Sequence, residues 1–115
     1  MDEPNEATTL FVYGSLLDET RREEIIGRRV DILRAILHDY ELGRARYFYI
    51  RKHPGVVTRG LLLLNLTSLD FQALDQYEEI PRLYTRELIR VFDERGNRVR
   101  CWVYMPTPLA LHGAE

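Results

Sequence analysis

The chain has 115 residues, of which 45% are hydrophobic and 30% charged, and its formal net charge is −2 at pH 7. This length predicts one domain with one core, and the weak negative charge disfavours a dedicated polyanion-binding protein. A single cysteine, Cys101, excludes an intrachain disulfide and favours a reducing, cytoplasmic setting. No apolar run approaches the roughly 20 residues of a membrane-spanning helix, so we expect no membrane association.

The N-terminal part of the chain predicts a leader, a strand, a turn and a helix. Residues 1–8 are acidic and polar, lack signal-peptide character, and are expected to form a disordered leader. Thr9 to Tyr13 is β-prone and apolar on both faces, which is typical of a buried strand, and Gly14 ends it. A short helix is expected over 18–26, because Asp18 can cap its start and a glycine follows its end.

The central part of the chain carries three apolar runs. Residues 30–42 fit either a helix or a strand, and we favour a strand over Ile32–Tyr40. Further strands are predicted at 46–50 and 60–66, and His53–Gly55 predicts a turn between them.

The C-terminal part predicts one helix and a strand pair. The helix is expected over 68–78, before Pro81. Residues 84–92 and 99–105 predict antiparallel strands joined by a glycine-containing hairpin loop. Residues 107–115 are expected to be a peripheral tail.

These elements amount to about six strands and two short helices. The mixture predicts an α+β fold built on a small mixed, mostly antiparallel β-barrel. The single domain is expected to span residues 9–106.

Helical periodicity predicts different environments for two adjacent glutamates. Phe71, Leu74 and Glu78 share one face of the expected helix, whereas Glu79 falls on the polar face. Glu78 therefore points toward the core or a cavity beside it, where desolvation raises the pKa of a carboxyl group. A general acid/base that works near neutral pH needs such a pKa. The other interpretation is that Glu78, at a helix end, turns out to solvent.

The junction at Tyr13–Leu16, where a strand meets glycine and serine, is a candidate anion-binding turn. Backbone N–H groups at such a turn can bind a carboxylate or phosphate, aided by the N-terminus of the following helix. Most junctions of this kind bind nothing, so the pattern alone leaves both interpretations open. Ser15 lacks a G-x-S-x-G context and an obvious histidine partner, which disfavours a nucleophilic role.

Three other features carry less chemical signal. The histidines His38, His53 and His112 show no metal-ligand spacing, so no metal is expected. Cys101 lies in an alternating strand and is expected to be a small core residue. Residues 44–52 interleave basic and aromatic side chains, which suits a stacking platform for single-stranded nucleic acid or, equally, a solvated strand edge. The negative net charge disfavours the nucleic-acid interpretation.

In order and spacing, these motifs resemble the γ-glutamylcyclotransferase-like family, also called the AIG2-like family. The resemblance runs from about residue 10 to 106 and rests on Phe11–Leu16, Pro54–Val57, Gly60–Leu62, Leu74–Glu78, Tyr84–Arg86 and Trp102–Tyr104. It implies a small barrel with a cavity at one end. It also implies a cofactor-independent reaction, in which a γ-glutamyl group cyclises to 5-oxoproline and releases an amine or amino acid.

The resemblance implies roles for individual residues. Glu78 would be the catalytic acid/base, taking a proton from the substrate's α-ammonium group and returning it to the leaving amine. The implied substrate-binding residues are Tyr13, Gly14, Ser15, Leu16, Tyr84 and Tyr104. Trp102 fits the cavity wall and ordinary core packing equally well.

Two features depart from the family pattern. Glu79 stands where many relatives have glycine, and the loop Pro81–Leu83 is short, so a tighter or differently shaped pocket is expected. The expected partner is a small γ-glutamyl molecule, with no nucleic acid and no membrane, and the protein is expected to be a monomer or weak homodimer. Two alternatives remain: a small-molecule-binding protein of this fold without the activity, and an RNA- or partner-binding barrel.

Overall fold

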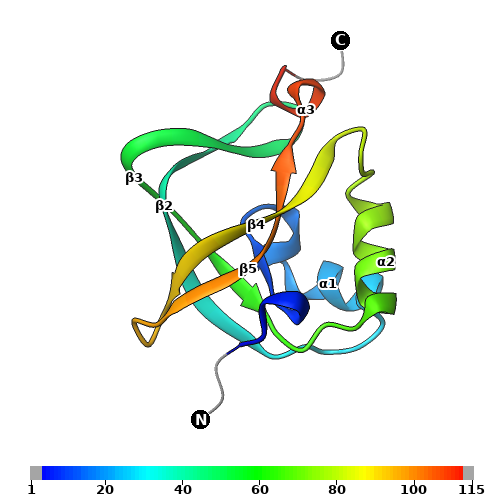
Figure 1. The fold of residues 1–115 in the computed structure, drawn as a ribbon. Helices are drawn as coiled ribbons and strands as arrows, with labels where there is room; N and C mark the ends of the chain where they lie inside the picture. Colours follow the sequence, from blue (N-terminus) through cyan, green and yellow to red (C-terminus); the bar gives the residue numbers. More distant parts are fainter. Residues whose placement is uncertain (1–3, 113–115) are drawn as a thin grey trace.

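The computed structural model describes residues 4–112, which form a closed five-stranded barrel with two helices together on one side and the C-terminal helix apart from them (Figure 1). The strands are β1 (Leu10–Val12), β2 (Ile32–Arg44), β3 (Phe48–Leu63), β4 (Tyr84–Asp93) and β5 (Arg98–Pro106). Their order is β1-β3-β2-β4-β5, and a parallel contact between β1 and β5 closes the barrel. The other neighbours are antiparallel. The α+β class and the mostly antiparallel barrel are confirmed.

Strand β1 is buried on both faces, as its composition predicts. Phe11 and Tyr13 pack inside the barrel, whereas Leu10 and Val12 pack toward the helices. Gly60 on β3 permits the close approach of β1, because a Cβ there would lie 2.2 Å from the carbonyl oxygen of Val12. Strand β1, which leads into the Tyr13–Leu16 turn, is therefore packed on both faces and paired along both edges.

The sequence predicts two strands, at 46–50 and 60–66, with a turn between them. The structure has one continuous strand, β3, in their place. Residue His38 of β2 pairs with Val57, but Tyr40 pairs with Lys52, so residues 53–56 stand opposite Asp39 alone. The Asp39 carboxylate accepts a hydrogen bond from the Gly55 N–H at 3.0 Å, and Gly55 adopts φ 87°. The predicted turn is thus a wide bulge inside one continuous strand.

The helices begin and end where their capping residues predict. They are α1 (Glu19–Ile26), α2 (Ser68–Tyr77) and α3 (Pro108–His112), with 3-10 turns η1 (Glu6–Thr8) and η2 (Ser15–Leu17). The Asp18 carboxylate accepts from the Thr20 N–H at the start of α1, and Gly27 ends that helix at φ 85°. Thr67 and Asp70 form a reciprocal capping box at the start of α2. Both expected helices are confirmed.

The ends of the described chain are more ordered than the sequence predicts. Within the expected leader, η1 is capped by the Asn5 side chain, and the Thr9 hydroxyl donates to the Asn5 carbonyl at 2.6 Å. The expected peripheral tail contains α3, whose Ala110 is completely buried in the core. A short apolar helix can fill the end of a small core, which the sequence pattern does not reveal. Residues 1–3 and 113–115 lie outside the described residues.

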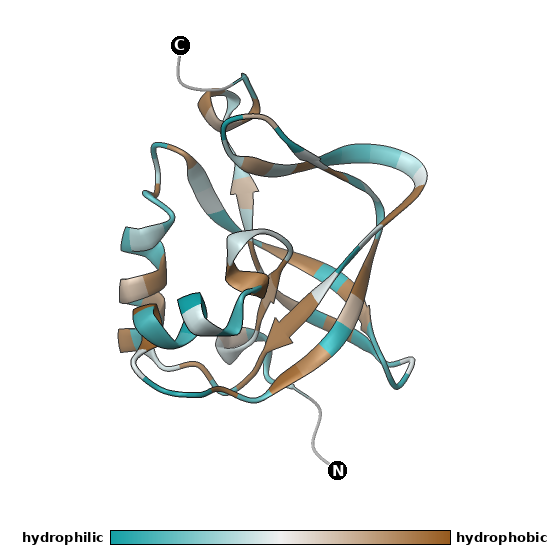
Figure 2. Ribbon diagram, turned by 180° about the vertical axis from the view of Figure 1, so that it is seen from behind, coloured by the Kyte–Doolittle hydropathy of each residue, from teal (hydrophilic) through white to brown (hydrophobic). Residues whose placement is uncertain are grey.

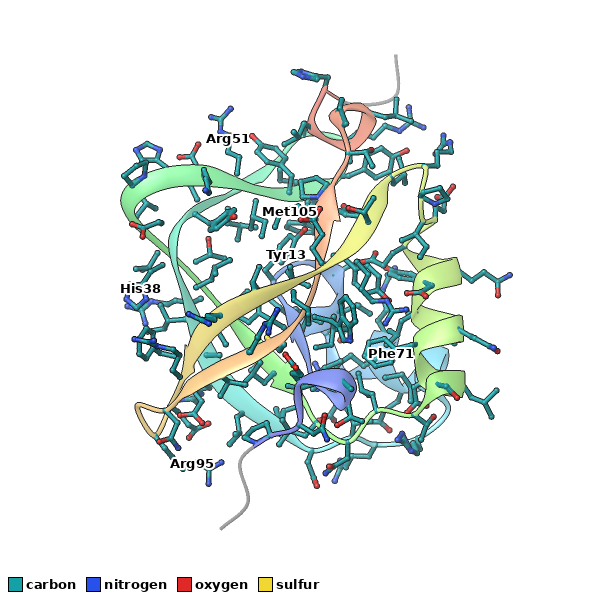
Figure 3. All side chains as sticks on the ribbon, in the orientation of Figure 1. Tyr13, His38, Arg51, Phe71, Arg95 and Met105 are labelled. Carbon is teal, nitrogen blue, oxygen red and sulfur yellow. The ribbon has the colours of Figure 1, made fainter. Side chains whose placement is uncertain are left out.

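The core has two parts, one inside the barrel and one between the barrel and the helices. Figure 2 shows hydrophobic residues concentrated at the carboxyl end of β3, while much of the outer arc of the β2–β3 hairpin is hydrophilic. Phe71 lies between α2 and the barrel (Figure 3). No helix within residues 4–112 is long and apolar enough to cross a membrane.

Candidate active site

A cavity of about 290 Å³ opens between the end of β1, the end of α2 and the tip of the β2–β3 hairpin. Every residue to which the sequence analysis assigns a catalytic or substrate-binding role lines it: Tyr13, Gly14, Ser15, Leu16, Glu78, Tyr84 and Tyr104. Trp102 does not, because it faces a separate groove with Phe71 and Arg86. Tyr13 lies near the middle of the barrel (Figure 3). The fold thus brings together segments about sixty residues apart.

Glu78 and Glu79 occupy different environments at the end of α2. The N–H of Glu78 donates to the Leu74 carbonyl at 2.9 Å, so this residue continues the helical turn. Burial raises the pKa of the Glu78 carboxyl from its usual 4.5 to about 7. Glu79 also borders the cavity, but it is exposed and forms an ion pair with Arg82 at 3.3 Å. The predicted difference between the two glutamates is present in the structure.

The Gly14 turn leaves backbone donors unpaired beside Glu78. No acceptor within residues 4–112 pairs with the N–H groups of Gly14, Ser15 or Leu16. Glycine is required for packing here, because a Cβ on Gly14 would lie 2.9 Å from the Cβ of Phe48. Unpaired N–H groups at the wall of a cavity favour a bound oxygen anion or carbonyl.

Three tyrosines of the cavity already donate their hydroxyl protons to the protein. Tyr13 donates to the Tyr104 carbonyl at 2.6 Å, and Tyr104 donates to a carboxylate oxygen of Asp75 at 2.6 Å. Tyr84 donates to the Phe48 carbonyl. Burial raises the pKa of all three phenols, so they stay neutral. Their rings therefore supply rigid apolar walls, and their oxygens remain available as acceptors.

The cavity is also lined by residues that the sequence does not assign to this site. The Tyr77 hydroxyl contacts the Ser15 hydroxyl at 2.7 Å and accepts from Arg21 at 3.1 Å, which joins α2 and α1 to the glycine turn. The hairpin tip adds Arg44, Arg46, Tyr47 and Phe48 to the cavity wall. Their basic and aromatic pattern marks them in the sequence, but only the strand pairing places them at this site.

Cys101, His38 and His53 do not line the cavity. Cys101 is buried inside the barrel, and burial raises the pKa of its thiol to about 12, which confirms a core role. His38 packs edge-on against Phe92, and His53 contacts Glu41 at 3.0 Å. Across the part of the chain that the structure describes, no cluster of three or more His, Cys, Asp or Glu side chains could hold a metal ion.

The family model described as gamma-glutamyl cyclotransferase, AIG2-like, matches residues 10–114. The chain belongs to this family. It is 27% identical over 104 residues to a Methanocaldococcus jannaschii protein named "Gamma-glutamylcyclotransferase and putative RNase". That match covers 88% of this chain and 47% of the relative, so this AIG2-like chain spans about half the length of the relative.

Solved structures share the AIG2-like fold. An Arabidopsis thaliana protein has a TM-score of 0.78 at 24% identity, covering 88% of this chain and 69% of that chain. A structure named gamma-glutamyl cyclotransferase has a TM-score of 0.76 at 19% identity, covering 87% of this chain and 66% of that chain. At these identities the likeness concerns the fold.

The site of this AIG2-like chain combines three chemical features. It has one carboxyl group that is about half ionised near pH 7, a set of unpaired backbone donors, and apolar walls. A carboxyl group of this pKa can both accept and return a proton at neutral pH. The donors can stabilise negative charge on an oxygen beside it.

Proposed function

We propose that this protein is a γ-glutamylcyclotransferase-type enzyme. It cyclises a γ-glutamyl amine or γ-glutamyl amino acid to 5-oxoproline and releases the amine. The observation that carries the proposal is the position of Glu78, whose carboxyl pKa is about 7, in the same cavity as the unpaired donors of the Gly14 turn. Membership of the family supports the class of reaction.

In the proposed mechanism, Glu78 relays protons from the attacking nitrogen of the substrate to the leaving nitrogen. The Glu78 carboxylate takes a proton from the α-ammonium group, and the freed α-amine attacks the γ-carbonyl carbon. The new C–N bond closes a five-membered ring, and the γ-amide C–N bond breaks. Glu78 returns the first proton to the leaving nitrogen, and it then relays the second proton, which the new ring nitrogen must lose, to the released amine. The amine leaves as an ammonium ion, and the Glu78 carboxylate is regenerated.

The backbone N–H groups of the Tyr13–Leu16 turn bind the reacting substrate in this proposal. They hold its α-carboxylate or stabilise the negative charge that develops on the γ-carbonyl oxygen. Because ring closure is intramolecular, the main task of the cavity is to fold the substrate into the attack geometry. The reaction needs no cofactor.

The test is turnover of a panel of γ-glutamyl compounds, with 5-oxoproline measured by chromatography. The panel includes γ-glutamyl amino acids, simple γ-glutamyl amides and γ-glutamyl-lysine derivatives. We expect product from at least one member. An absence of product across the panel, with binding of the same compounds detected by calorimetry, would instead favour a small-molecule-binding protein of this fold.

A second candidate function, RNA binding, is favoured by the stacked arginines of the hairpin tip. The Arg44 guanidinium lies 4.6 Å from the centroid of the Phe48 ring, and that of Arg46 lies 5.9 Å from the Tyr47 ring. The M. jannaschii relative also carries the word RNase in its name. Salt-sensitive binding of single-stranded RNA by the wild-type protein would support this candidate.

A further inference from the structure

Two arginines stand at the open side of the cavity. Arg44 is the last residue of β2 and Arg46 lies in the following loop, and both are exposed while they line the cavity. The Arg44 guanidinium stacks on Phe48, the same side chain that packs against the Gly14 turn. This stacking holds a positive charge at the rim next to the proposed substrate-binding turn.

Neither arginine has a carboxylate partner within residues 4–112. The nearby arginine of the same hairpin, Arg51, differs, because it forms an ion pair with Glu41 at 2.6 Å. Glu79, which lines the cavity together with Glu78, is paired with Arg82. The rim therefore carries an excess of positive charge that the described protein does not neutralise.

The positive charge at the rim does not lower the pKa of the Glu78 carboxyl. Burial accounts for the raised pKa of the Glu78 carboxyl, with no offsetting attraction from a guanidinium group. Arg44 and Arg46 are exposed, so their charge faces the outer part of the cavity.

Ring closure determines which part of the substrate reaches this rim. The α-amine and the γ-carbonyl must meet beside Glu78, and of the two alternatives for the Gly14 turn we take the one in which it binds the α-carboxylate. With the α-carboxylate bound there, the leaving group is the remaining substituent outside the new ring, and in this proposal it projects to the open side. The outer end of the leaving group therefore meets Arg44 and Arg46.

We propose that Arg44 and Arg46 form a subsite for a carboxylate on the leaving group. The substrate class is then a γ-glutamyl amino acid or short γ-glutamyl peptide with a free carboxylate, in preference to a γ-glutamyl amine without one. Two guanidinium groups match the planar, doubly accepting geometry of a carboxylate. This inference rests on the proposed function and names its substrate class.

The first test compares γ-glutamyl-alanine with γ-glutamyl-alaninamide, which have the same shape but differ in one charge. We expect the wild-type kcat/KM to be about 10- to 100-fold higher for the acid, because charge-assisted hydrogen bonds are lost with the amide. The Arg44→Gln/Arg46→Gln double variant should lose this preference, so that the ratio of its kcat/KM values for acid and amide falls to about 1. Arg51→Gln removes the same charge from the same hairpin, where Arg51 points outward (Figure 3), and should keep the preference.

The second test measures binding of both compounds to the Glu78→Gln variant by calorimetry, so that it does not depend on turnover. Tighter binding of the acid that disappears on adding the arginine substitutions would support the subsite even if cyclisation fails, and would then overturn the proposed function alone. Equal kcat/KM and equal affinity for acid and amide in otherwise active protein would overturn the subsite alone. RNA binding lost in the double variant, without any preference for the acid, would also overturn it.

Discussion

Glu78 and Glu79 are adjacent and chemically identical, and the backbone gives them different surroundings. Glu78 keeps a helical conformation and stays against the cavity, whereas Glu79 turns to φ 55° and reaches the solvent-exposed Arg82. A positive φ is uncommon for a residue other than glycine, and many relatives are expected to have glycine at this position. Glu79 adopts the positive φ that glycine favours, so the turn that ends α2 forms although glycine is absent from this position.

Glu78→Gln should lower turnover by about 10²- to 10⁴-fold, because glutamine keeps the shape but cannot accept a proton. Glu79→Gln should retain near wild-type turnover, since its side chain is exposed and paired only with Arg82. The measurement is the steady-state rate of 5-oxoproline formation by both variants. Equal losses in the two variants would contradict the assignment of Glu78 as the acid/base.

The raised pKa of Glu78 also predicts a pH-dependent stability. The folded state holds the Glu78 proton up to about pH 7, whereas the unfolded chain releases it near 4.5, so ionisation opposes folding as pH rises. The shift corresponds to roughly 3 kcal/mol of lost stability above pH 7 and none below pH 4.5. Glu78→Gln should therefore be more stable than wild type at pH 8 and about equally stable at pH 4.

This prediction is measured by urea unfolding of both proteins at the two pH values. A stability difference that is the same at pH 4 and pH 8 would show that the Glu78 carboxyl is not desolvated. For the proposed reaction of the wild-type protein, the same ionisation should make kcat/KM rise with pH through an inflection near 7.

At the scale of elements, one ionic cluster joins α2 to β4 and β5. Asp75 on α2 accepts from the Tyr104 hydroxyl at 2.6 Å and from Arg86 Nη2 at 3.2 Å, while Arg86 Nε lies 3.2 Å from Asp75 without forming a hydrogen bond. The Arg86 guanidinium lies 4.5 Å from the Phe71 ring and 4.8 Å from the Trp102 ring. The cluster therefore holds Tyr104, a residue of the cavity wall, in place through its hydroxyl group.

Arg86→Ala should destabilise the protein by about 2 kcal/mol or more, because it removes packing between two rings and leaves the half-buried Asp75 without a cationic partner. The matched control is Arg82→Ala, whose partner Glu79 is exposed, and it should stay within about 0.5 kcal/mol of wild type. Denaturant unfolding measures both. If Arg86→Ala lowers the free energy of unfolding no more than Arg82→Ala does, the cluster does not anchor α2.

At the scale of the whole molecule, the C-terminal segment completes the core between the barrel and the helices. Ala110 of α3 is fully buried with residues from β1, α2 and β5. The Thr107 hydroxyl donates to the carbonyls of Arg82 and Leu83 at 2.7 and 3.0 Å, which ties α3 to the loop after Glu79. The segment therefore supports the loop that follows the proposed catalytic residue.

Ala110→Asp should destabilise the protein by about 3 kcal/mol or more, because it places a charge in the core without a partner. His112→Asp adds the same acidic side chain at an exposed position of α3 and should change stability by only about 0.5 kcal/mol. Thermal melts compare the two variants. Similar melting temperatures for both would indicate a peripheral tail, as the sequence predicts.

The sequence by itself determined the elements whose signals are local. Asp18, Gly27 and Thr67 act on backbone groups within a few residues of themselves, so both helices could be placed from the sequence. The apolar run in β1 predicted a strand buried on both faces for the same reason. The spacing of Phe71, Leu74 and Glu78 placed the glutamate toward the cavity, and the family resemblance indicated the same residue.

Only the tertiary structure decided which of these elements meet. Whether His53–Gly55 is a turn between strands or a bulge within β3 depends on its pairing with β2, which no local pattern encodes. The same pairing carries Arg44 and Arg46 to the cavity rim, and position along β5 separates Tyr104 at the cavity from Trp102 outside it. Barrel closure sets these contacts, because it brings strands distant in the chain to a fixed register, and a local sequence pattern contains no information about that register.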